Sequence, residues 1–178
     1  MMRGRSYRRG LTGIIGLLAI LVLCAVAWTS FRSESDGRGG IAVGKEAPAI
    51  EGIDTSGAKV DLLDYRGQPV LVNFWASWCQ PCVKEMPLID RTYREASDRF
   101  RLISVNVGDT KGTVNEFLKA HDISFPVLID ATGRAAERYR VSALPATFAI
   151  DAEGRLSRAG IGELTEAEQL YKLLQIDK

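Results

Sequence analysis

Residues 70–87 read VLVNFWASWCQPCVKEMP, and this stretch decides the fold class. Its first part, residues 70–75, is an apolar run that is typical of a strand covered on both faces. Pro81 then opens the pattern of a helix, because proline fits a first turn, where its missing N–H is not needed. Cys79 and Cys82 therefore lie where a buried strand gives way to a helix.

Strands and helices alternate along the rest of the chain. Two short runs before this stretch, AIEGI at 49–53 and AKVDL at 58–62, predict a hairpin, since Asp and Gly between them favour a turn. Further strands are expected at 102–107, 127–130, 147–151 and 155–161, and helices around 114–120 and 165–174. The alternation predicts an α/β architecture with helices on both faces of the sheet.

Single residues predict details of the helices. Pro87 should kink the helix that contains it. Thr165 and Glu168 have the spacing of a capping box that opens the last helix. His121 follows a helix and is expected as a solvated helix-end residue.

Composition excludes several classes of function. The 178 residues are 46% hydrophobic and 25% charged, as in a globular protein. Because the sequence has 23 basic and 22 acidic residues, its charges nearly cancel and give no overall positive field that would bind nucleic acid. The three cysteines and single histidine cannot build a structural zinc site, since Cys24 lies far from the CxxC pair and His121 stands alone. We expect no metal and no cofactor.

The N-terminal region predicts a membrane anchor. Residues 10–31 carry no charge and as a helix would measure about 33 Å at ~1.5 Å per residue, enough for a hydrocarbon core of ~30 Å. Four arginines within residues 1–9 place that end in the cytoplasm. We expect a flexible, glycine-rich tether at 32–44 and a working domain at 45–178, outside the cytoplasm.

Other arrangements of this region stay open. Ala25-Val26-Ala27 fits the small-x-small rule for signal-peptide cleavage, although the apolar run is longer than a typical signal core. A lipoprotein anchor on Cys24 would call for a small residue where Leu23 stands. The pair Arg8-Arg9 is a poor match to a twin-arginine signal.

The spacing of Cys79 and Cys82 predicts a thiol redox pair. Free N–H groups at the helix start favour a thiolate on Cys79, the expected nucleophile, and Cys82 would resolve the mixed disulfide. Half of a metal site and two unrelated thiols are the alternatives. A c-type haem attachment needs His after the second cysteine, where this chain has Val83.

Three segments together resemble the thioredoxin superfamily and, more closely, the ResA-type membrane-anchored reductases of bacterial cytochrome c maturation. They are VNFWASWCQPCVKEMP at 72–87, SVNVGDTK at 104–111 and VSALPATFAI at 141–150, and the likeness also includes the predicted hairpin at 49–62. The resemblance implies a thioredoxin-like fold with a central mixed sheet flanked by helices and an N-terminal β-hairpin extension. It also implies a cis peptide bond between Leu144 and Pro145, with Pro145 facing the disulfide, whereas X-Pro bonds in general favour trans.

Glu85 shares a helix face with Cys82, three residues earlier. A surface glutamate is the plain alternative, but the resemblance implies a glutamate in the active-site cavity. Two negative charges ~6 Å apart at a dielectric of ~20 repel by about 2.8 kcal/mol, more than the about 0.3–1 kcal/mol that a helix start contributes. Thiolates would then be hard to form, which predicts a reductase whose Glu85 also moves protons.

The resemblance completes the expected function. It implies the CxxCH cysteines of apocytochrome c as substrate, a CcdA-type membrane thiol carrier as electron donor, and Leu144 as a candidate substrate contact beside the catalytic Cys79, Cys82, Glu85 and Pro145. Trp78 is adjacent to Cys79, so it either packs in the core or forms a wall that faces the substrate. Copper-site cysteines of oxidase assembly, as in TlpA-like relatives, are an alternative substrate, and a Cu(I) metallochaperone is an alternative function. Neutral Gln80, where ResA-like reductases usually have an acid, should make this pair somewhat less reducing.

Overall fold

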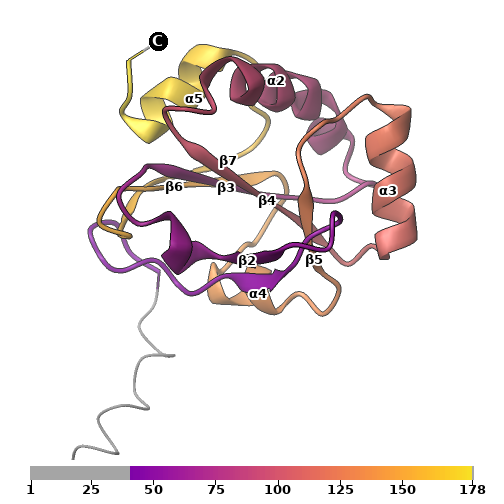
Figure 1. Ribbon diagram of the computed structural model, residues 1–178, viewed down its shortest axis with the longest axis horizontal. Helices are drawn as coiled ribbons and strands as arrows, with labels where there is room; N and C mark the ends of the chain where they lie inside the picture. Colours follow the sequence, from indigo (N-terminus) through magenta and orange to yellow (C-terminus); the bar gives the residue numbers. More distant parts are fainter. Residues whose placement is uncertain (1–40, 178) are drawn as a thin grey trace, which may run out of the picture. The chain divides into compact units, whose positions relative to one another are not determined.

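A five-stranded mixed sheet forms the centre of the fold in the computed structural model, which describes residues 41–177. The strand order is β5-β4-β3-β6-β7, in which β3 pairs parallel with β4 and antiparallel with β6 (Figure 1). The strands are β3 (Val70–Trp75), β4 (Arg101–Val107), β5 (Val127–Asp130), β6 (Ala146–Ile150) and β7 (Leu156–Ile161). The thioredoxin-like α/β fold with a central mixed sheet is confirmed.

Helices cover both faces of this sheet, as Figure 1 shows: α2 and α5 lie over one face, and α4 lies with β2 on the other. The alternation of side chains along β3 explains the two layers, because Leu71 and Trp75 pack toward α2 while Val72 and Phe74 pack toward α4. The helices are η1 (Leu62–Tyr65), α2 (Gln80–Ala96), α3 (Lys111–Ala120), α4 (Arg134–Arg138) and α5 (Ala167–Leu174).

The strands β1 (Glu51–Ile53) and β2 (Lys59–Asp61) form a separate antiparallel pair. The turn between them is held by Asp54, whose Oδ1 accepts the Ala58 N–H at 3.0 Å. Ile50, just before β1, is fully buried in the core beneath the sheet. The segment before β3 therefore packs against the face of the sheet that lies opposite α2.

The start of α5 differs from the predicted capping box at Thr165 and Glu168. The observed N-cap is Glu166, whose N–H donates to Gln169 Oε1 at 3.1 Å, while the Gln169 N–H donates to the Glu166 backbone carbonyl at 3.1 Å. Gln169 also accepts the Thr165 N–H, at 2.7 Å. The prediction was therefore wrong by one residue, because Gln169 is better placed than Glu168 to reach back over the helix start.

Helix α2 begins at Gln80, so Pro81 lies in its first turn as expected, and the helix continues through Pro87 to Ala96. The kink at Pro87 stays a prediction. The short α4 was not predicted. His121 is the C-cap of α3, as expected, and its ring lies 4.3 Å from that of Phe117.

The expectations for residues 1–40 lie outside the described residues. They are the basic N-terminus, the membrane helix at 10–31, most of the tether, and the alternatives at Cys24 and Ala27. Between residues 41 and 177, no helix combines the length and the hydropathy that crossing a bilayer requires.

Candidate active site

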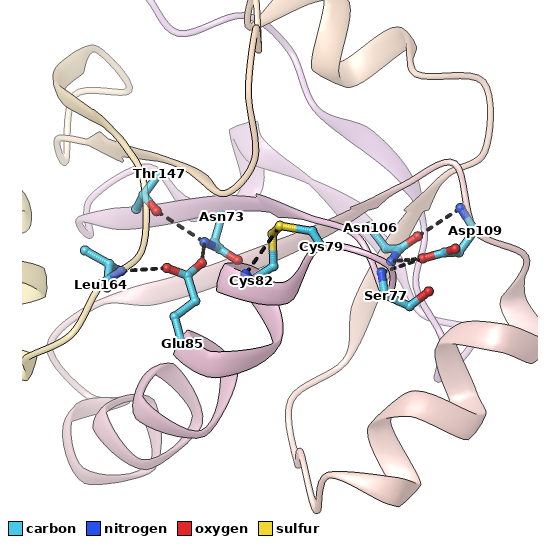
Figure 2. Close-up of a disulfide and its surroundings, with 9 residues drawn as sticks. All are labelled: Asn73, Ser77, Cys79, Cys82, Glu85, Asn106, Asp109, Thr147 and Leu164. Atoms are coloured by element: carbon cyan, nitrogen blue, oxygen red, sulfur yellow. Dashed lines mark hydrogen bonds between the residues drawn. A yellow bond between two sulfur atoms is a disulfide. The ribbon is translucent and has the colours of Figure 1, made fainter.

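Cys79 and Cys82 form a disulfide with an S–S distance of 2.04 Å at the start of α2 (Figure 2). Cys79 is the N-cap of the helix, and its Sγ accepts the Cys82 N–H at 3.3 Å. Cys82 is fully buried, whereas 6% of Cys79 is exposed. Cys79 is thus the more accessible of the two cysteines, and its role as the nucleophile stays a prediction.

Glu85 lies one turn further along α2 and is fully buried. Its Oε1 accepts the Asn73 Nδ2–H at 2.8 Å and its Oε2 accepts the Leu164 backbone N–H at 2.8 Å (Figure 2). Desolvation by burial raises the pKa of Glu85 to about 7, the two hydrogen bonds oppose this rise, and the nearby Glu163 carboxylate adds to it. The alternative of a solvated surface glutamate is therefore wrong.

The partners of Glu85 were not predicted from sequence. Asn73 is a fully buried residue of β3, and its Nδ2 also donates to Thr147 Oγ1 on β6 at 3.2 Å. One signal for Asn73 was present, a single amide within the otherwise apolar run of β3. Leu164 acts through its backbone N–H, which has no signature in the side-chain sequence.

The loop before Cys79 is held by Asp109, in the segment after β4, together with Asn106 of β4. Asp109 Oδ2 accepts the Ser77 backbone N–H at 2.9 Å and the Asn106 Nδ2–H at 2.8 Å. In return, Asn106 Oδ1 accepts the Asp109 N–H at 3.2 Å. Figure 2 draws this group on the Cys79 side of the disulfide and Glu85 on the Cys82 side. The chain segment that presents Cys79 is thus fixed to a neighbouring strand.

The remaining predicted site residues differ in exposure. The Leu144–Pro145 peptide bond is cis, which confirms the prediction, and Pro145 is buried. Leu144 is half-buried and packs against the hydrophobic cluster that contains both cysteines. Trp78 is 68% exposed beside Cys79, so it is available to a partner. The roles of Pro145, Leu144 and Trp78 in substrate binding stay predictions.

The described residues offer no group of three or more His, Cys, Asp or Glu side chains arranged to hold a metal ion. The chemistry that the arrangement supports is instead the interconversion of a disulfide and a dithiol next to a carboxyl that can be charged or neutral near pH 7.

Comparisons with known proteins point to the same chemistry. The model of the AhpC/TSA family matches residues 43–159. The thiol-disulfide oxidoreductase ResA of Bacillus subtilis (strain 168) is 36% identical over 153 residues, which are 85% of this chain and 85% of ResA. The crystal structure of StoA from Bacillus subtilis covers 71% of this chain and 96% of its own, with a TM-score of 0.63 and 28% identity. The pneumococcal exposed lipoprotein thioredoxin from Streptococcus pneumoniae covers 72% of this chain and all of its own, with a TM-score of 0.66 and 29% identity.

Proposed function

Because the chain belongs to the AhpC/TSA family and is a thiol-disulfide oxidoreductase of the ResA type, we propose that it works as a reductase of protein disulfides outside the cytoplasm. The Cys79 thiolate attacks a substrate disulfide, forms a mixed disulfide and releases one substrate thiolate. The Cys82 thiolate then attacks Cys79 Sγ and releases the second. Two electrons pass to the substrate, whose thiolates take up two protons, and the Cys79–Cys82 disulfide is left.

The burial of Glu85 one turn from Cys82 carries the proposed direction of electron flow. A carboxylate in that position repels thiolates on the same helix, and the low polarity of its surroundings weakens screening. When thiolates are disfavoured, the reduced form of a cysteine pair is less stable than the reduced form of a strong oxidant. Such a pair therefore gives up its electrons more readily. The carboxyl, with its pKa raised to about 7, would also store a proton between the two sulfur transfers.

The substrate that we propose is the CxxCH cysteine pair of apocytochrome c, kept reduced for haem attachment. Support comes from the likeness to the ResA-type reductases, and exposed Trp78 beside Cys79 offers a surface to such a partner.

We also propose that residues 10–31 anchor the chain with residues 1–9 in the cytoplasm. Compartments outside the cytoplasm are oxidising, so the dithiol would be regenerated by a CcdA-type thiol carrier in the membrane.

Trapping in cells tests this proposal. The full chain with Cys82→Ala should retain its mixed disulfide on Cys79, because the resolving thiol is missing. We expect c-type cytochrome precursors among the proteins released by reductant. The matched control, with both Cys79→Ala and Cys82→Ala, should release none of them. Recovery of copper-oxidase subunits without any cytochrome precursor would reject the proposed substrate in favour of copper-site cysteines.

The direction of electron flow has its own test, a redox titration of the full chain in glutathione or thioredoxin buffers. A reductase should have a midpoint potential far below that of strongly oxidising thiol proteins, which is about −120 mV. Glu85→Gln should move the potential upward, because the repulsion disappears. A wild-type value near that of the oxidants would contradict the proposed direction.

A further inference from the structure

The carboxyl group of Glu85 is surrounded by donors, which suits only its charged form. Oε2 accepts from the Leu164 backbone N–H and Oε1 accepts from Asn73 Nδ2. The uncharged acid carries an O–H that needs an acceptor, and burying such a group without one is costly. Since Glu85 is fully buried, bulk solvent does not supply that acceptor. A backbone N–H cannot become an acceptor, so Leu164 cannot serve the acid.

Asn73 holds an unused acceptor next to this site. Its Oδ1 is buried and has no hydrogen-bond partner among the residues that the structure describes. A half-turn of the amide about its terminal side-chain bond exchanges Oδ1 and Nδ2 with little change in shape. Oδ1 would then face both Glu85 and Thr147, the two groups that Nδ2 contacts at 2.8 and 3.2 Å.

Thr147 fits either orientation of that amide. Its hydroxyl accepts from Asn73 Nδ2 in the observed arrangement and can donate to Oδ1 after the half-turn, because a hydroxyl is both donor and acceptor. Thr147 is buried on β6, directly opposite Asn73 in the antiparallel pairing of β3 and β6. The contact therefore persists through the exchange.

We propose that Asn73 is a positioning residue whose side-chain amide turns over with the proton on Glu85, donating through Nδ2 to the carboxylate and accepting through Oδ1 from the carboxylic acid. The inference deepens the proposed function and rests on the proton-storing role given there to Glu85. A proton that arrives on Oε1 forms an O–H directed at Asn73 Oδ1, and Thr147 changes from acceptor to donor. The buried carboxyl keeps a hydrogen bond to Asn73 in both states.

Other groups around Glu85 must be separated from this effect. Glu163, in the segment before α5, is the charged group that raises the pKa of Glu85 by its own field. On α2 itself, Cys79 and Cys82 can lose protons only after reduction, so they do not contribute to a titration of the disulfide form. The strands β3 and β6 contribute the neutral Asn73 and Thr147. Oxidised protein is therefore the right material for the test.

The test is nuclear magnetic resonance on the full oxidised chain in detergent micelles, labelled with ¹³C in Glu and ¹⁵N in Asn. The sequence has only three asparagines, so the amide signals of Asn73 can be identified by their loss in Asn73→Leu. Titration of the Glu85 carboxyl carbon should have its midpoint near pH 7. Over the same range, the nuclear Overhauser contact between the Asn73 Nδ2 protons and the Thr147 side chain should be strong at high pH and lost at low pH. If Glu85 titrates while that contact stays constant, the proposal is overturned.

Glu85→Gln is the matched control, because its amide has a permanent donor and does not titrate. The Leu164 N–H requires an oxygen on its side, so the glutamine NH₂ group should face Asn73 and hold it turned at every pH. The nuclear Overhauser contact between the Asn73 Nδ2 protons and the Thr147 side chain should then be absent from pH 5 to pH 9.

Disulfide-exchange rates distinguish a failure of the proton-storing role of Glu85 from a failure of the turning amide of Asn73. If the pH profile of exchange is the same in wild type and Glu85→Gln, the proton-storing role of Glu85 fails. If the profile changes while the Asn73 contact does not depend on pH, only the turning amide fails.

Discussion

Burial dominates the electrostatics of Glu85. Two hydrogen bonds, from Asn73 and from the Leu164 backbone, favour the carboxylate, yet the pKa rises from the ordinary value of 4.5 to about 7. Desolvation therefore outweighs both bonds, and the Glu163 carboxylate adds to it. The result is a carboxyl that is partly protonated at neutral pH, which is the condition for efficient proton transfer there.

The raised pKa predicts how stability depends on pH. Between pH 4.5 and about 7, the folded oxidised protein holds a proton on Glu85 that the unfolded chain releases. The stabilisation is thus complete below pH 4.5 and is lost as the pH rises through 7. The size of the loss is about 3 kcal/mol at ~1.4 kcal/mol per pKa unit. Urea denaturation of the oxidised chain across this range measures it.

Glu85→Gln is the control for this slope, since its side chain stays neutral. As the pH rises from 4.5 to 8, the wild type should lose about 3 kcal/mol of unfolding free energy that the variant keeps, so the difference between the two proteins should change by that amount. A difference between the two proteins that stays constant over the range would contradict the assignment of the slope to Glu85.

Gln80 offers a second test at the scale of one residue. It is exposed, and its substitution Gln80→Glu places a negative charge between Cys79 and Pro81. Because that charge is solvated, repulsion of the Cys79 thiolate should be small, and the midpoint potential should fall by about 10–20 mV. Gln80→Lys should raise it by a similar amount, as measured by redox titration. Shifts of the same sign in both variants would rule out a charge effect.

At the scale of elements, the segment between β3 and α2 depends on Asp109 in the segment after β4. Asp109→Ala removes the acceptor of the Ser77 N–H and of Asn106 Nδ2. Hydrogen bonds to a charged group contribute more than neutral ones, so the loss should be about 1–3 kcal/mol in a half-buried setting. Urea denaturation measures the stability, and amide hydrogen exchange at Ser77 should become faster.

Asp109→Asn is the matched variant, because its remaining oxygen can still accept the Ser77 N–H. It should lose less stability than Asp109→Ala and keep the slow exchange of Ser77. Equal exchange rates in all three proteins would show that Asp109 does not hold the loop.

The sequence predicted the elements whose signals are local. The apolar run of β3 and the proline in the first turn of α2 place the CxxC pair where the structure has it. At the start of α5, Thr165 with Glu168 and Glu166 with Gln169 both have capping-box spacing, and only the folded chain selects the second. The five-residue α4 has too few turns to give a helical period.

The environment of Glu85 could not be predicted for another reason. Its i, i+3 relation to Cys82 is visible in the sequence, but its burial depends on residues that are distant along the chain. Thr147 is 74 positions from Asn73, and Leu164 is 79 positions from Glu85. Contacts of that separation follow from the sheet order and not from local pattern.

For the whole molecule, the sheet holds the site between its layers. β3 leads directly into the loop that presents Cys79, β6 follows the cis Leu144–Pro145 bond, and the two strands are neighbours in the sheet. The segment after β7 supplies the Leu164 N–H. Three parts of the chain that are remote in sequence therefore meet around Glu85, one turn of α2 away from Cys82.

Reduction should consequently lower the stability of the entire domain at pH 9.5. In the folded dithiol form, repulsion by the ionised Glu85 keeps a thiol protonated, whereas the unfolded chain ionises it at this pH, because an ordinary thiol titrates near about 8.5. The free energy that folding loses is about 1.4 kcal/mol for one thiol, which corresponds to a Tm about 4–6 °C lower than that of the oxidised chain. Calorimetry of both forms measures the gap, and Glu85→Gln should narrow it. A reduced form more stable than the oxidised one, as in strong thiol oxidants, would show that this pair accepts electrons instead of donating them.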